Sequence, residues 1–228
     1  MSNKVVFVTQ EDPFYVREFF EELLDHWGDA GNIATIVIAP PMGKRSLARL
    51  ARQMYGLYGP VDFVRLGTRF AWFKLARRLS DLFGWKASYS VAQACLKRGQ
   101  RVERVDSLNA PEFLAKLKGL EPDLVISVAA PQVFGQPLID SARLGCFNIH
   151  NSLLPKYRGM LPNFWQLYHG EKTVGTTVHR INAALDDGEI LLQQRVEVVS
   201  GESLESLIRR TKRLGAHLMI DAVRRAFN

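Results

Sequence analysis

Three short runs of apolar residues constrain the fold of this chain more than any other feature of its sequence. Residues 5–9 read VVFVT, residues 33–39 read IATIVIA, and residues 123–128 read DLVISV. Runs of this kind are typical of parallel strands that are covered on both faces. Segments with the spacing of amphipathic helices separate them, beginning with residues 14–27. The alternation predicts an α/β fold with a mostly parallel, twisted sheet flanked by helices.

The pattern changes towards the end of the chain. Residues 175–181 (GTTVHRI) and 190–198 (ILLQQRVEV) read as strands, and Asp186-Asp187-Gly188 lies between them as a turn signal. A strand, a tight turn and a second strand predict an antiparallel pair added to the parallel sheet. Residues 202–227 then carry apolar side chains at helical spacing and predict a long final helix.

The residues after the first strand argue against one common use of such a fold. Gln10, Glu11, Asp12 and Pro13 stand where a dinucleotide-binding fold carries GxGxxG. A nicotinamide-dependent dehydrogenase is therefore not expected. We expect Asp12 to cap the next helix and Pro13 to occupy its first turn.

Residues 145–159, GCFNIHNSLLPKYRG, carry the strongest chemical signal. Residues 146–150 predict a strand that ends in a loop, and alternate side chains of a strand point the same way. Asn148 and His150 therefore lie side by side. Asp186 follows after a segment long enough for a helix and a strand. An amide, an imidazole and a carboxylate brought together at strand ends predict an acyl-transfer site.

The three residue types suit attack by an amine on a formyl carbon. A tetrahedral oxyanion develops there, and one well-placed donor lowers the barrier by about 2.7–4 kcal/mol. We expect the Asn148 amide and a protonated His150 to donate. Asp186 would accept the proton of the amine and favour the cationic form of His150. Taken singly, each residue also fits an ordinary turn, cap or hydrogen-bonding role.

The two cysteines, Cys95 and Cys146, have no CxxC or zinc-ligand spacing, and we predict no metal site from them. Cys146 lies on the same strand face as Asn148, so a nucleophilic thiol is one interpretation. A small buried apolar side chain is the interpretation that we favour.

The segment FNIHNSLLPKYRG, followed by GEKTVGTTVHRINAALDDGEIL, resembles the core signature of the folate-dependent formyltransferases. Members of this family act on methionyl-tRNA, glycinamide ribonucleotide or amino sugars, and one hydrolyses the folate donor. The resemblance implies a Rossmann-like formyltransferase fold over residues 1–228, 10-formyltetrahydrofolate as donor, and no metal. It implies that Asn148, His150 and Asp186 are catalytic, Asp186 rather than Asp187 because the family's aspartate stands two residues before the glycine. It also implies a folate pocket lined by Pro131, Gln132, Val133, Phe134, Ser152, Leu153, Leu154 and Pro155.

Departures from the family pattern narrow the expected acceptor. QEDPF stands where the purine enzyme has a glycine-serine-asparagine phosphate loop, and Asn151 stands where the family usually has proline. We expect neither the extra C-terminal domain of the tRNA enzyme nor the regulatory domain of the deformylase. The resemblance then favours a small amine acceptor, an amino sugar that is phosphorylated through a nucleotide or carrier. Hydrolysis of the folate donor and a methionyl-tRNA acceptor are the alternatives.

The net charge of +7 is concentrated in one segment. Residues 44–78 hold nine Lys/Arg and one acid, Asp62. We expect residues 42–86 to form a basic helical insertion, divided at Gly59-Pro60 and weakened near Gly67. Three interpretations stay open: a packed insertion with a solvated basic face, contact with anionic lipid or a phosphorylated carrier, and nucleic acid, which we favour least. A non-enzymatic binding module that uses this insertion is the alternative to an enzyme.

The first residues, MSNKVVFVTQEDPF, become acidic too early for a secretory signal, and the sequence holds no run of 18 uncharged apolar residues. We therefore expect a cytoplasmic protein. A homodimer could form through residues 161–168 or the final helix.

Overall fold

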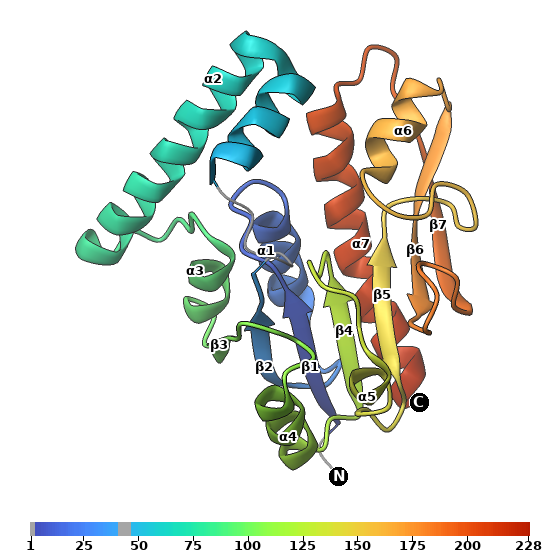
Figure 1. The fold of residues 1–228 in the computed structure, drawn as a ribbon. Helices are drawn as coiled ribbons and strands as arrows, with labels where there is room; N and C mark the ends of the chain where they lie inside the picture. Colours follow the sequence, from blue (N-terminus) through green and yellow to red (C-terminus); the bar gives the residue numbers. More distant parts are fainter. Residues whose placement is uncertain (1–2, 41–46) are drawn as a thin grey trace.

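The chain forms one mixed sheet of seven strands in the order β3-β2-β1-β4-β5-β6-β7 (Figure 1). The computed structural model describes residues 3–40 and 47–228, apart from the side chains at 47–50, 53, 54, 57 and 58. Neighbouring strands from β3 to β5 pair in parallel, and β6 and β7 pair antiparallel. The fold class predicted from the sequence is confirmed. The strands are β1 (Lys4–Thr9), β2 (Asn32–Ile38), β3 (Val102–Arg104), β4 (Leu124–Val128), β5 (Cys146–His150), β6 (Thr173–Arg180) and β7 (Ile190–Glu197).

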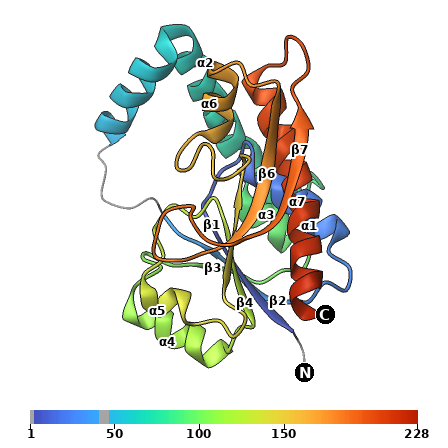
Figure 2. The same ribbon diagram turned by 90° about the vertical axis from the view of Figure 1, so that its right-hand side faces the viewer.

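Helices cover both faces of the sheet (Figures 1 and 2). On one face, α1 (Val16–His26), α3 (Val91–Leu96) and α7 (Leu204–Phe227) share an apolar core with inward-facing strand residues such as Phe7 and Ile149. On the other face, α4 (Pro111–Leu120) and α5 (Gln136–Ile139) pack on residues such as Val6 and Val125. The apolar runs are buried on both sides because both layers are present.

Two helix starts differ from the sequence prediction. The N-cap of α1 is Tyr15, without a side-chain cap, because Asp12 Oδ1 instead accepts from the backbone N–H groups of Phe14 and Tyr15 in a turn before the helix. The final helix, predicted from residue 202, begins as α7 at Leu204, and Ser203 Oγ caps it by accepting from Ser206 N at 3.2 Å.

The expected helical insertion is α2 (Leu47–Phe83), which projects from the body of the molecule (Figure 1). It is two helical segments joined at Gly59, whose φ of 72° and ψ of 174° are not helical, and Pro60 begins the second segment. The predicted division is confirmed, whereas the weakening near Gly67 is wrong, since the helix continues through it. Lys44, Arg45 and the side chain of Arg49, all part of the basic count, lie outside the described residues.

The strand order reverses between β1 and β4, where the chain crosses from one half of the sheet to the other. Ligands of open α/β sheets bind at the carboxyl ends of the strands beside such a reversal. Thr9 Oγ1 donates to Val128 O at 2.8 Å and ties these two strand ends together. Beside this edge, α6 (Pro162–Tyr168) packs on α7, where Asn163 Nδ2 donates to Thr211 Oγ1 at 2.9 Å. Within the described part of the chain, every helix is too short or too polar to span a bilayer.

Gly175 in β6 is required for close packing, and Gly175→Ala should lower the free energy of unfolding by about 2 kcal/mol. An added Cβ would clash with Leu153 Cδ2 and with the backbone oxygen of Gln194. Gly119→Ala is the matched control, because a Cβ at this helical position meets no atom within 4 Å. The control should gain up to about 1 kcal/mol from helix propensity. Urea denaturation of both variants measures the difference, and equal stabilities would contradict the packing argument.

Candidate active site

The sheet brings the three residues singled out from the sequence together at its carboxyl edge. Asn148 and His150 point to the same side of β5, and Asp186 lies in the loop between β6 and β7 with a positive φ of 48°. Asn148 Nδ2 donates to Asp186 Oδ1 at 3.3 Å, and His150 Nδ1 lies 3.5 Å from Asp186 Oδ2. Asp187 instead pairs with Arg158 at the surface. The structure thus places Asp186, and not Asp187, beside the amide and the imidazole.

A fourth polar residue, His179, completes the cluster and was not singled out in the sequence. The antiparallel pairing of β5 with β6 sets His179 opposite Asn148. His179 Nε2 lies 3.1 Å from Asn148 Nδ2 and 3.6 Å from Asp186 Oδ1, and the side chain is buried. The only sequence signal was the alternation in residues 175–181, which gives the face of the strand but not its partner.

The hydrogen bonds fix the orientation of these side chains. An ionised carboxylate only accepts, so the Asn148 amide nitrogen must face Asp186. His179 Nε2 is then an acceptor for the same amide group, and its Nδ1–H donates to Arg180 O at 2.7 Å. Gly159 N–H donates to Asp186 Oδ2 at 2.8 Å. Both N–H groups of Asn148 are therefore engaged within the cluster.

The pKa of Asp186 lies below its usual range although the side chain is largely buried. Burial alone would raise this pKa, but the contact with His179, the nearby His150 and the backbone N–H of Gly159 outweigh it. Asp186 is consequently a carboxylate at neutral pH, available to hold a positive charge that forms beside it.

The pKa of His150 is lowered, which corrects the expectation of a cationic imidazole. Burial is the largest cause, and the favourable effects of the Asp186 charge and of the Tyr157 carbonyl do not overcome it. His150 Nε2 lies 2.7 Å from Tyr157 O, to which it donates, so Nδ1 carries the free lone pair. The resting site thus holds a neutral imidazole that can accept a proton at Nδ1 beside Asp186.

The residues expected to line a folate pocket divide into two sets. Four are buried: Gln132, Phe134, Ser152 and Leu154. The Gln132 side chain bonds three backbone groups, Leu108 N, Pro40 O and Asp106 O, and Ser152 Oγ donates to Lys156 O at 2.7 Å. The buried set therefore shapes the loops. The other four residues, Pro131, Val133, Leu153 and Pro155, are partly or fully exposed.

Cys146 is not a nucleophile in this structure. The thiol is buried, its Sγ lies 3.6 Å from Leu138 O, and burial raises its pKa to about 12. The favoured interpretation of a small buried side chain is confirmed.

Lys212 of α7 adds a cation beside the cluster that the sequence did not indicate. Its charge contributes to the lowered pKa of His150. Burial lowers the pKa of the Lys212 ammonium itself, against the opposing charge of Asp12 in the loop after β1. The site therefore combines a carboxylate, two imidazoles, an amide and a neighbouring lysine.

Comparison with known proteins assigns the chain to a family. The family model described as formyl transferase matches residues 82–223, more than half of the chain. The chain therefore belongs to the formyl transferase family, as its resemblance at the sequence level indicated.

Curated relatives match part of the chain. Methionyl-tRNA formyltransferase of Kosmotoga olearia is 37% identical over 135 residues, which cover 59% of this chain and 43% of that protein. Methionyl-tRNA formyltransferase of Syntrophus aciditrophicus is 41% identical over 114 residues, 50% of this chain and 36% of that protein. The matched segment thus spans less than half the length of these relatives.

Solved structures share the fold over nearly the whole chain. Glycinamide ribonucleotide transformylase 1 from Geobacillus kaustophilus superposes with a TM-score of 0.68 at 19% identity and covers 100% of both chains. A sugar N-formyltransferase from Shewanella sp superposes with a TM-score of 0.59 at 18% identity, covering 98% of this chain and 69% of that one. At these identities the likeness concerns the fold.

The lowered pKa of His150 predicts a stability that falls in mild acid. A histidine of the unfolded chain has a pKa of about 6.5, and folding lowers that of His150. Below about pH 6.5 the unfolded state binds more protons, so stability falls as pH decreases towards the folded pKa, whereas above it this contribution is constant. His150→Gln should remove this part of the slope, as urea denaturation between about pH 5 and pH 8 measures.

His169→Gln serves as the control for this slope, because His169 is an exposed histidine outside the cluster. It should keep the pH dependence of the unmodified chain. A slope that is the same with and without His150 would contradict the proposed burial of a neutral imidazole.

Proposed function

We propose that this protein transfers the formyl group of 10-formyltetrahydrofolate to a primary amine by direct attack. The proposal rests on one observation, the contact of Asp186 with Asn148 and His150 at 3.3 and 3.5 Å. Membership of the formyl transferase family supports the same reaction type. The alternative of a non-enzymatic binding module leaves this buried polar cluster without a role.

The residues supply the parts that such a transfer needs. The amine nitrogen attacks the formyl carbon, and the carbonyl oxygen becomes an oxyanion that requires donors. Asn148 supplies an amide N–H once it exchanges its internal bond for the substrate oxygen. The attacking nitrogen loses its proton to His150 Nδ1, and Asp186 stabilises the imidazolium that results. Collapse of the intermediate breaks the bond from the formyl carbon to the folate nitrogen, which takes the proton as it leaves.

We propose an amino sugar, phosphorylated through a nucleotide or carrier, as the acceptor. Lys212 supports an anionic acceptor, since it places an ammonium near the cluster with Asp12 as the opposing charge. Two alternative acceptors are methionyl-tRNA and water. The curated relatives are methionyl-tRNA formyltransferases, which favours tRNA, and water as acceptor would make the protein a hydrolase of the folate donor.

Removal of either side chain on β5 should abolish most of the activity. Asn148→Ala and His150→Ala should each reduce turnover by at least about 100-fold, the effect of losing one donor or proton acceptor in the transition state. His169→Ala, an exposed imidazole outside the cluster, should retain turnover. Formation of tetrahydrofolate from the formyl donor measures the rate. Near-normal turnover in either β5 variant would refute the assignment.

The same assay identifies the acceptor. Donor consumption is followed with nucleotide-linked amino sugars, with methionyl-tRNA and with no amine. Consumption that requires the amino sugar supports the proposal, while a rate that is independent of any amine identifies a hydrolase. Formylation of methionyl-tRNA alone would replace the proposed acceptor.

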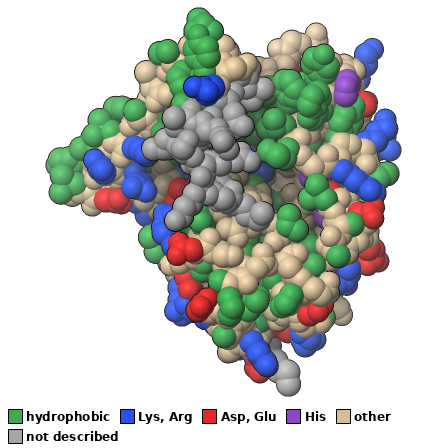
Figure 3. Space-filling view, viewed as in Figure 1, with side chains coloured by type: hydrophobic (Ala, Val, Ile, Leu, Met, Phe, Trp, Pro, Cys, Tyr) green, Lys and Arg blue, Asp and Glu red, His purple; other side chains and the backbone are tan. Residues whose placement is uncertain are grey.

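The outer face of α2 carries an exposed apolar stripe. Val61, Trp72 and Leu82 are 78%, 57% and 75% exposed, and Val64 and Leu75 lie on the same helical face. Basic side chains lie beside this stripe (Figure 3), and the spacing sets Arg65 and Arg78 at its borders. Other residues of α2 form its inner face, which packs on the rest of the protein.

The inner face of α2 explains how the helix is held. Phe73 packs edge-on against Phe14 with ring centroids 5.3 Å apart, and Ala76 is buried. Arg69 donates to both oxygens of Glu205 on α7, at 3.2 and 2.9 Å. The sequence analysis counted Arg69 only among the nine basic residues of the expected insertion. In the structure Arg69 joins α2 to α7, and a second, apolar face of α2 is exposed.

We propose that the outer face of α2 contacts an anionic lipid surface that carries the acceptor. A helix with an exposed apolar stripe, a tryptophan and basic borders matches the chemistry of the membrane interface. Nucleic acid would leave the valines and leucines without a partner. In a pair of identical chains the basic borders would face each other unfavourably.

Vesicle sedimentation tests this contact. The protein should bind vesicles with anionic phosphatidylglycerol more strongly than neutral phosphatidylcholine vesicles, and salt should weaken the binding. Replacing Trp72 and Leu75 together with Ser should lower binding at least about tenfold, since each side chain contributes about 1.5–3 kcal/mol on burial. Val199→Ser, at another exposed apolar position, should have no effect. Equal binding of the double variant would contradict the contact.

A further inference from the structure

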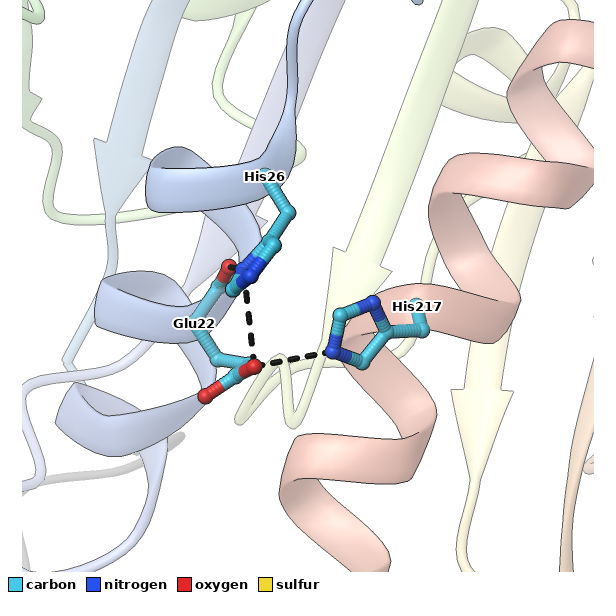
Figure 4. A group of neighbouring side chains, drawn as sticks. All are labelled: Glu22, His26 and His217. Carbon is cyan, nitrogen blue, oxygen red and sulfur yellow. Dashed lines mark hydrogen bonds and ion pairs between the residues drawn. The ribbon is translucent and has the colours of Figure 1, made fainter.

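Three potential metal ligands meet at the surface where α1 and α7 run side by side (Figure 4). Glu22 and His26 lie one turn apart on α1, and His217 faces them from α7. His217 Nε2 lies 2.8 Å from Glu22 Oε1, and His26 Nδ1 lies 3.4 Å from the same oxygen. The carboxylate thus stands between two imidazoles that come from the first and last helices of the chain.

The geometry suits a transition metal. One ligand atom from each residue lies within 4.8 Å of the other two. Two ligands of a tetrahedral zinc ion, each about 2.0–2.1 Å from the metal, are roughly 3.4 Å apart. His26 Nδ1 also lies 2.9 Å from the backbone oxygen of Glu22, so this ring must turn to free a nitrogen, and side-chain rotations then close the site. Both histidines are exposed and Glu22 is partly exposed, so an ion has free access.

We propose that Glu22, His26 and His217 bind one divalent ion of the zinc class, with water completing the coordination. Two imidazoles and one carboxylate form a donor set that zinc, copper and nickel prefer to magnesium or calcium. The ion would join α1 to α7. None of these residues takes part in the proposed formyl transfer, because α1 starts near the carboxyl edge of the sheet and His26 is its last residue.

Ion pairs on both sides of the Glu22, His26 and His217 cluster already join the α1 region to α7. Glu18, one turn before Glu22, pairs with Arg209 of α7, and Asp29 beyond α1 lies 3.4 Å from Arg224. Ion pairs therefore tie the two helices on either side of the cluster. A bound ion would replace the weak Glu22–His contacts between them with metal–ligand bonds.

Isothermal titration with zinc chloride tests the site on the full chain without a histidine tag. One ion should bind per chain, and cobalt(II) should bind at the same place with visible absorption bands. His217→Ala, His26→Ala and Glu22→Gln should each weaken binding by at least about tenfold. His169→Ala removes an exposed histidine elsewhere and should bind as the unmodified chain does.

Thermal unfolding gives a second readout that does not depend on activity. Zinc at about a hundredfold excess over its dissociation constant should raise the Tm of the unmodified chain by about 5 °C. The Tm of Glu22→Gln, a variant of nearly the same shape, should rise by no more than about half as much, because binding that is at least tenfold weaker leaves at most about a tenfold excess. The proposal is overturned if no single ion binds, or if binding survives in both His217→Ala and His26→Ala. Loss of binding in His169→Ala as well would locate the ion elsewhere.

Discussion

The antiparallel pairing of β5 with β6 is the constraint on which the candidate site depends. β6 runs back along β5 from its carboxyl end, so that Thr177 pairs with His150 and Arg180 with Phe147. This direction places His179 opposite Asn148, and the loop after β6 folds back so that Asp186 contacts Asn148 and His150. Gly159 N–H then fixes Asp186 from the loop that follows β5. One change of strand direction therefore assembles groups from three separate segments.

Burial gives the two central groups opposite charge preferences. Asp186 stays ionised because Asn148 and Gly159 donate to it, whereas His150 is neutral because burial outweighs the favourable effects of Asp186 and of the Tyr157 carbonyl on its charged form. A neutral imidazole beside a carboxylate can take up a proton without prior loss of one. The resting state thus differs from the cationic His150 of the sequence argument, while the same three residues remain the proposed catalytic group.

The sequence predicted the elements whose periodicity was strong and missed what depends on pairing. The bounds of β5 and the proximity of Asn148, His150 and Asp186 followed from alternation and spacing. His179 did not, because alternation does not name a cross-strand partner. The pKa of His150 depends on burial that only packing determines. In α2, helical periodicity located apolar positions but could not tell which stripe packs on Phe14 and which, through Trp72, stays exposed.

The helix α2 and the candidate active site both contact α7. Arg69 holds α2 to Glu205 in the first turn of α7, and its guanidinium lies 5.4 Å from the ring centroid of Phe14, next to the Asp12 loop. Lys212 lies two turns further along α7, facing the charge of Asp12. A surface that positions α2 would therefore also position the lysine proposed for the acceptor. α7 itself packs on the sheet through an apolar core that it shares with α1 and α3.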